Sequence, residues 1–206
     1  MAKKEVPLTT LQDYLPEGCI NEVLHYLNTH KIHLTITRER QTILGDYRHA
    51  HLGKAHRISV NGNLNKFSFL ITLLHEIAHL LTFEKYGSRI MPHGKEWKFE
   101  FSKILSAFLA NQIFPNDIQN ALLKSIENPA ASTCGDQQLM RVLRHYDAHN
   151  NDRFLVEQMP IGKTFQIKDG RTFIKGEKLR TRYKCKEIAT GKIYLFNGLY
   201  EVKEME

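Results

Sequence analysis

The sequence predicts an α+β body followed by a small all-β tail, and three observations lead to this fold class. Apolar residues recur at helical spacing over much of the first 150 residues, whereas apolar and polar residues alternate in three short runs before residue 61. After residue 153 the chain consists of short β-like runs separated by glycines at hairpin spacing. With 206 residues, of which 42% are hydrophobic, the chain is long enough for one or two domains with their own cores.

The elements of the body follow from these periods and from local stop signals. We expect a helix at about 17–30, strands near 33–40, 41–47 and 56–60, helices over 66–86 and 94–109, a helix opening at Pro115, and a helix over 136–148. Asn61-Gly62 is a turn signal after the third strand, and Gly87 is a natural end for the long helix. These elements predict a body at 1–128, a helical connector at 129–153 and a β tail at 154–206.

Composition narrows the classes of protein further. The excess of 29 Lys and Arg over 22 Asp and Glu gives a net charge of +7, which fits a nucleic acid or another anionic partner. Three separated cysteines exclude a disulfide framework and a four-cysteine zinc ribbon. The N-terminus lacks the apolar core of a signal peptide, and the apolar stretch 67–83 is too short and too polar to span a membrane. We therefore expect a cytoplasmic protein without a membrane partner; its oligomeric state is left open.

One motif in the long predicted helix indicates a metal site with a catalytic role. His75, Glu76 and His79 form an H-E-x-x-H sequence, in which the two histidines lie one helical turn apart on the same face. Both imidazoles can therefore reach one metal ion, and Glu76 is placed to take a proton from a water at that ion. Most of the surrounding residues are apolar. Burying polar side chains among them costs free energy unless these side chains are paired or bind a ligand.

A catalytic zinc site needs a third protein ligand and an open position. Thr82 and Lys85 stand where the metzincin extension would require Gly and His, so that class is excluded. His93 precedes the next helix and is our first candidate for the third ligand. Glu100 is the second candidate, and Glu96 is a further acid on the same helix.

These residues resemble the SprT-like family, which includes Spartan-type proteases of DNA–protein crosslinks. The positions that match the family pattern are His75, Glu76, His79, His93, Gly94 and Trp97. The resemblance covers roughly residues 10–128 and implies a zincin-like minimal metallopeptidase body, with the active-site helix beside a small antiparallel sheet. It also implies one zinc ion per chain and a protein or peptide substrate. Many members end in a four-cysteine zinc ribbon, from which this chain departs because its tail retains only Cys185.

The implied mechanism is hydrolysis of a peptide bond by metal-activated water, with Glu76 as the general base. The strand at 56–60 is expected to offer its edge to an extended peptide. Tyr86 and Arg89 are candidates for stabilising the oxyanion by proximity alone, and ordinary surface roles explain them as well. The alternative function is a non-proteolytic nucleic-acid-binding or regulatory protein, related to stress or transcription, in which zinc is structural.

The positive charge is concentrated in the tail. Five basic residues are predicted to alternate along one strand and to share a face: Lys178, Arg180, Arg182, Lys184 and Lys186. Phe173, Tyr183 and Tyr194 lie among them and could stack on bases, so DNA is a candidate partner of the tail. A solvated charged face that prevents edge-to-edge pairing explains the pattern equally well.

His49, His51 and His56 form a further cluster in the body. They could hold a second metal ion, but the basic residues among them, Arg48, Lys54 and Arg57, favour a solvated loop.

Overall fold

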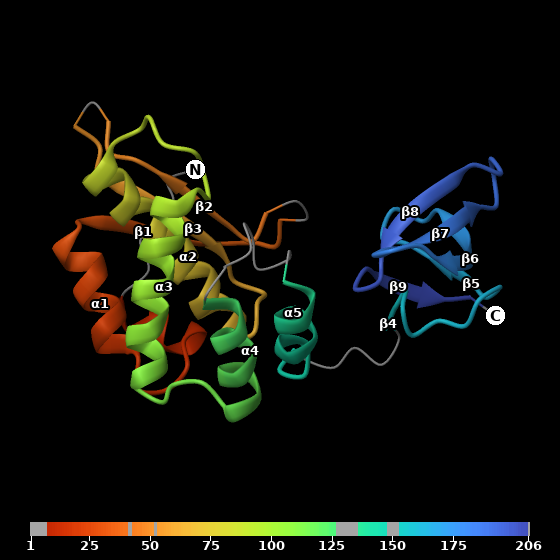
Figure 1. Ribbon diagram of the computed structural model, residues 1–206, viewed down its shortest axis with the longest axis horizontal. Helices are drawn as coiled ribbons and strands as arrows, with labels where there is room; N and C mark the ends of the chain where they lie inside the picture. The colour runs from red at the N-terminus through yellow and green to blue at the C-terminus, as the bar shows by residue number, and fades with distance from the viewer. Residues whose placement is uncertain (1–7, 41–42, 52, 127–135, 148–152, 206) are drawn as a thin grey trace. The chain divides into compact units, whose positions relative to one another are not determined.

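A computed structural model describes residues 8–40, 43–51, 53–126, 136–147 and 153–205 (Figure 1). The chain forms two compact units, residues 1–147 and 148–206. The first unit combines helices with a three-stranded sheet, and the second contains a six-stranded sheet. The predicted α+β class is therefore confirmed, as is the all-β character of the tail.

The first unit contains one 3-10 helix, five α-helices and three strands among its described residues. They are η1 (Leu8–Tyr14), α1 (Ile20–Thr29), β1 (Ile32–Thr37), β2 (Gly45–Arg48), β3 (His56–Asn61), α2 (Lys66–Tyr86), α3 (Lys95–Ala110), α4 (Asn116–Ile126) and α5 (Gln137–Arg144). Helix α5 falls in the predicted connector, yet its Leu139 and Leu143 are buried in the same hydrophobic cluster as α2. It therefore packs as part of the first unit, while residues 129–135 and 148–152 of the connector lie outside the described residues.

The small sheet is mixed and has the order β1-β3-β2. Strands β1 and β3 are parallel, whereas β2 and β3 are antiparallel. The expected antiparallel sheet is corrected in this respect, because alternation along a strand does not fix the direction of its neighbour. The expectation that 56–60 offers a free edge was wrong, because β3 is the central strand and is paired on both sides. The edge strands are β1 and β2.

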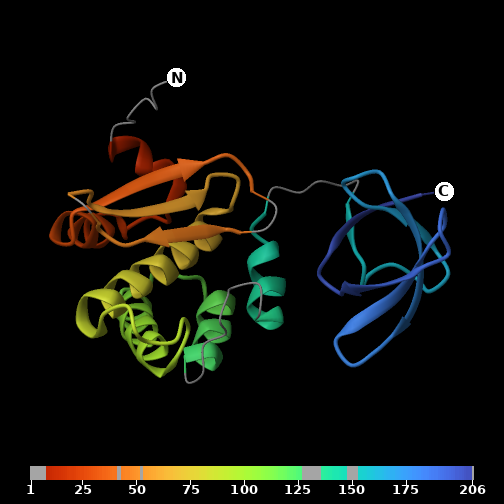
Figure 2. The same ribbon diagram turned by 90° about the horizontal axis from the view of Figure 1, so that it is seen from above.

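Helix α2 is the central helix of the first unit. Figure 2 shows the sheet on one side of it and α3 and α4 on the other. The Asn65 side chain caps its start by accepting a hydrogen bond from the Ser68 N–H at 2.9 Å, and Gly87 ends it with a φ of 77°. By length and composition α2 could cross a membrane, but 72% of that apolar window is buried inside the protein, as in the core helix of a globular domain.

The second unit is an antiparallel sheet with the strand order β4-β9-β5-β6-β7-β8. Its strands are β4 (Phe154–Leu155), β5 (Thr164–Gln166), β6 (Thr172–Lys178), β7 (Arg182–Glu187), β8 (Ile193–Asn197) and β9 (Glu201–Glu204). Phe165, Phe173 and Cys185 are fully buried at the centre of its core. The single strand predicted to carry the basic residues from Lys178 to Lys186 is interrupted, and β7 starts only at Arg182, because the Leu179 N–H donates to the Arg182 carbonyl at 2.7 Å and closes a turn.

Candidate metal centre

His75 and His79 lie on the face of α2 where the sequence placed them. Four residues in an α-helix make slightly more than one turn, so their side chains are stacked along the helix. Their Nε2 atoms are 3.3 Å apart. His75 is buried and His79 is half-buried, so the pair sits where the apolar core gives way to the surface.

His93 completes the group from the segment between α2 and α3. Its Nε2 lies 3.2 Å from Nε2 of His75 and 3.0 Å from that of His79. The backbone of His93 is left-handed, with a φ of 57°, which is uncommon for a residue with a side chain. Gly94 follows as the N-cap of α3, so the loop places His93 immediately before a rigid helix. Such unfavourable backbone conformations persist where the surrounding structure enforces them, often at functional sites.

The three imidazoles have the geometry that a tetrahedral metal ion requires. Zinc–nitrogen bonds of about 2.0–2.1 Å at tetrahedral angles place the nitrogens about 3.3–3.4 Å from one another. The observed separations of 3.0–3.3 Å are close to this, and the ligand atoms of His75, His79 and His93 form one group that could hold a metal ion. Three ring nitrogens that point at one centre cannot all be protonated there, so a shared cation fits them better than mutual hydrogen bonds.

The electrostatics favour the neutral imidazoles that bind metals. Burial, together with the smaller effects of the neighbouring His79 and His93, lowers the pKa of His75 to about 3. Burial and His93 together lower the pKa of His79 to about 4, and burial lowers that of His93. All three rings are therefore uncharged near neutral pH and can donate lone pairs to a cation.

Comparison with known proteins places this fold and site in a family. The model of the SprT-like family matches residues 17–119, half of the chain. The chain is 33% identical to Protein SprT of Proteus mirabilis over 152 residues, which cover 70% of this chain and 86% of the relative. It belongs to the SprT-like family.

Two further relatives match shorter parts of this SprT-like chain. Protein SprT of Yersinia pseudotuberculosis is 33% identical over 99 residues, which cover 44% of this chain and 58% of the relative. Protein SprT of Glaesserella parasuis is 48% identical over 31 residues, 15% of this chain and 19% of the relative. No solved structure matches the chain significantly.

Glu100, the second candidate for the third ligand, is engaged elsewhere in this SprT-like chain. Its carboxylate accepts a hydrogen bond from Lys85 Nζ at 2.8 Å and one from the Tyr86 hydroxyl at 3.4 Å. It does not belong to the group of ligand atoms formed by the three histidines. Glu96 is also outside that group and lies 4.0 Å from Lys95 Nζ. The position of His93 therefore favours it over both acids.

Two aromatic side chains of α3 pack against the histidines. The Trp97 ring is buried, and its centroid lies 4.6 Å from that of His75, 5.3 Å from His79 and 4.7 Å from His93. Phe101 stacks on Trp97 at 5.0 Å and contacts His75 at 5.7 Å. Trp97 belongs to the motif recognised in the sequence, whereas Phe101 was not predicted. Its spacing of four residues from Trp97 was the available signal, because such residues share a helix face.

Glu76 lies against strand β2 rather than in the histidine group. It is 7% exposed, and burial raises the pKa of its carboxyl to about 8, with Asp46 adding to the rise and Arg40 opposing it. A side chain at Gly45 would place its Cβ 2.6 Å from Oε1 of Glu76 and 2.8 Å from Cγ2 of Thr72. Only glycine lets β2 approach α2 so closely at this point. Gly45 was not among the residues predicted for the site.

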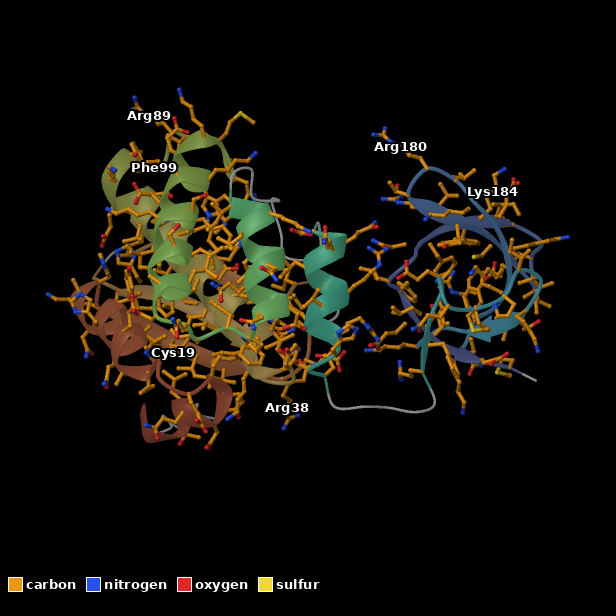
Figure 3. The ribbon with its side chains drawn as sticks, turned by 60° about the horizontal axis from the view of Figure 1, so that its bottom comes forward. Cys19, Arg38, Arg89, Phe99, Arg180 and Lys184 are labelled. Atoms are coloured by element: carbon orange, nitrogen blue, oxygen red, sulfur yellow. The ribbon has the colours of Figure 1, made fainter. Side chains whose placement is uncertain are left out.

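The two oxyanion candidates have different surroundings. The Tyr86 hydroxyl donates to Glu100, and its ring is 38% exposed. Arg89 is exposed, and Figure 3 shows it projecting outward from the segment between α2 and α3. Neither side chain contacts the histidines through a hydrogen bond among the described residues.

The five basic residues of the tail do not lie on one strand as predicted. Lys178 ends β6, Arg180 lies in the turn, and only the last three, Arg182, Lys184 and Lys186, belong to β7. Those three alternate with inward-facing neighbours and share the outer face of β7; Figure 3 labels Lys184 on this strand and Arg180 in the turn before it. The predicted stacking aromatics point the other way: Phe173 is buried, and Tyr183 and Tyr194 pack against the core. The turn signal around Leu179 was too weak to separate the two strands.

Proposed function

We propose that this SprT-like chain is a zinc-dependent metallopeptidase that hydrolyses peptide bonds. The observation that carries the proposal is the convergence of three neutral imidazoles beside a buried glutamate from the same helix. Three protein ligands leave a tetrahedral ion one open position, as in catalytic zinc sites, whereas structural zinc sites are closed by four. Within the described residues the group has three members, which favours the enzyme over the alternative of a regulatory protein with structural zinc.

His75, His79 and His93 would hold the ion through their Nε2 atoms. Zinc in such a site supplies Lewis acidity, which activates water and polarises a carbonyl group. The stacked rings of Trp97 and Phe101 pack against the imidazoles and restrict their orientation. The protein thus contributes a rigid set of ligands, which a catalytic metal requires.

Glu76 would act as the general base. Burial raises the carboxyl pKa to about 8, and a cation held by the neighbouring imidazoles would favour the carboxylate form that accepts a proton. In the forward reaction one of its oxygens accepts a proton from water as the water oxygen adds to the peptide carbon. The same carboxyl then delivers the proton to the amide nitrogen as the carbon–nitrogen bond breaks, so one water is consumed for each bond cleaved.

Strand β2 is the edge at which we expect the substrate to bind. It is paired with β3 on one side only, and Gly45 places it directly against Glu76. An extended peptide that pairs with β2 through main-chain hydrogen bonds would run past Glu76, and such pairing tolerates many side chains. The proposed substrate is therefore an extended or unfolded stretch of protein.

The test is a comparison of Glu76→Gln with the wild-type chain loaded with zinc. We expect the variant to keep one zinc per chain while cleavage of an unfolded protein substrate falls by at least about 100-fold, because the general base is lost. Glu100→Gln is a matched control, since it is an equally buried glutamate outside the histidine group. Wild-type cleavage rates in Glu76→Gln would contradict the proposed mechanism.

DNA remains a proposed partner of the tail. The outer face of β7 carries three basic residues, and its positive charge would attract a phosphate backbone. Neutralising Arg180, Arg182 and Lys184 together should weaken DNA binding and reduce its dependence on salt, as measured by fluorescence anisotropy. Unchanged affinity would leave the charged solvent face as the explanation.

A further inference from the structure

Charged and hydroxyl-bearing side chains gather on the outer face of the three-stranded sheet in the first unit. Because side chains alternate along a strand, Asp46 and Arg48 of β2 share a face with Arg57 and Ser59 of β3, opposite to the face of Gly45. Thr35 and Thr37 of β1 extend this face. Together with Arg40 and Ile58, these residues line a pocket.

Two arginines stand directly opposite each other in this pocket. The register of β2 and β3 pairs Arg48 with Arg57, and like charges at such positions repel. Asp46 accepts a hydrogen bond from Arg48 Nε at 2.9 Å and offsets one charge. Within the described part of the chain, no ion pair engages Arg57. An unfavourable arrangement of this kind is relieved when an anion binds between the two guanidinium groups.

Arg40 is a third guanidinium and is held in place before any ligand arrives. Its Nε donates to Asn61 Oδ1 at 2.7 Å and its Nη1 to Ser59 Oγ at 3.0 Å. Asn61 is 1% exposed and in turn donates to the main-chain carbonyl of Arg40 at 3.1 Å. A guanidinium fixed in this way loses little conformational entropy when it binds.

We propose that this pocket binds a phosphate group. Three guanidinium groups against one carboxylate leave an excess of two positive charges, which matches a phosphate better than a single carboxylate. The threonine and serine hydroxyls of the lining are further hydrogen-bond donors for its oxygens. The phosphate group belongs either to a nucleic-acid backbone or to a small phosphorylated molecule. The pocket lies on the opposite side of the sheet from Glu76, so its occupation leaves the proposed peptide edge accessible.

The experiment uses the full chain and three probes: a labelled single-stranded oligonucleotide, the same sequence as a duplex, and inorganic phosphate. Oligonucleotide binding is followed by fluorescence anisotropy at several salt concentrations, and phosphate binding by calorimetry. Arg57→Gln is the principal variant, because this exposed side chain has no role in the core. Arg89→Gln removes an equally exposed charge outside the pocket and serves as the matched control.

We expect Arg57→Gln to weaken binding of at least one probe by about tenfold, the typical effect of losing a hydrogen-bonded charge pair, while Arg89→Gln stays within about twofold of wild type. Loss confined to the oligonucleotides identifies a nucleic-acid backbone as the source of the phosphate, whereas loss that includes inorganic phosphate identifies a small ligand. Three results would overturn the proposal: no binding of any probe by wild type, wild-type affinity in Arg57→Gln, or equal losses in both variants. Neutralising the basic residues of the tail in parallel separates their contribution. None of these readouts depends on peptidase activity.

Discussion

Two groups of histidines in the first unit lie near acids, but their nitrogens are used differently. In the first group, the Nε2 atoms of His75, His79 and His93 point at one another across 3.0–3.3 Å. In the second group, Glu84 lies between His30 Nδ1 at 2.8 Å and His56 Nε2 at 3.7 Å. The second group satisfies its nitrogens with a carboxylate, whereas the first leaves its nitrogens directed at a common centre.

The partners of the ring nitrogens distinguish the two groups: in one group the nitrogens contact other side chains, and in the other they converge on one point. His56 also shares a hydrogen bond with the Tyr47 hydroxyl at 2.9 Å, and its ring stacks on that of Tyr47. It is half-buried, unlike the exposed His49 and His51, so the predicted solvated loop does not describe it. A histidine whose ring nitrogens already contact other side chains is less available to bind a cation. We therefore assign the metal to the first group alone.

The largest expected effect is on metal content. His93→Ala removes one of three ligands and should lower zinc affinity by several orders of magnitude, because two imidazoles on one helix hold the ion weakly. His56→Ala is the matched control from the second group and should retain one zinc per chain. Competition with a chelator of known affinity measures both. Equal zinc loss in the two variants would break the distinction between the groups.

A second prediction concerns the placement of Glu76. Gly45→Ala puts a Cβ within 2.6 Å of Oε1 of Glu76, so either the carboxylate or β2 must shift. We expect the peptidase rate to fall about 10- to 100-fold, since displacements of about 1 Å have effects of this size, with zinc content unchanged. Arg48→Gln, which changes an exposed residue on the opposite face of β2, is the comparison variant and should keep the wild-type peptidase rate. Full activity of Gly45→Ala would show that the close approach does not position Glu76.

The smallest effect is expected at Glu84. Glu84→Gln weakens the contacts with His30 and His56, but the Glu84 side chain is 38% exposed and solvent screens its charge. The free energy of unfolding, measured by urea denaturation, should change by at most about 1 kcal/mol, while zinc content and activity stay at wild-type values. A loss of zinc in this variant would mean that the second group supports the metal centre.

Local patterns predicted the central helix and the position of two of its histidines on one face. The helix predicted at 66–86 is observed as Lys66–Tyr86, because apolar periodicity, an N-cap and a terminal glycine all agree there. His75 and His79 follow from helical spacing alone. His93 was chosen over Glu100 on sequence grounds, and the structure supports this because Glu100 pairs with Lys85.

Contacts between segments that are distant in the sequence could not be predicted from these local patterns. The parallel pairing of β1 with β3 places β2 at an edge, and no local feature of the three strands encodes that order. The close approach at Gly45 follows from the same pairing. Lys175 is also a basic residue of the tail, yet it is 4% exposed and its ammonium lies 4.3 Å from the centroid of the Tyr183 ring. Charge alone did not distinguish this buried lysine from its exposed neighbours.

X-ray absorption at the zinc edge of the purified chain tests most directly whether three histidines hold the ion and leave one position open. We expect three imidazole nitrogens and one light non-protein ligand at about 2.0–2.1 Å, with one zinc per chain. The signal of one imidazole should disappear in His93→Ala and persist in His56→Ala. A sulfur ligand at about 2.3 Å, a fourth imidazole, or a spectrum unaffected by His93→Ala would contradict the assignment of an open three-histidine site.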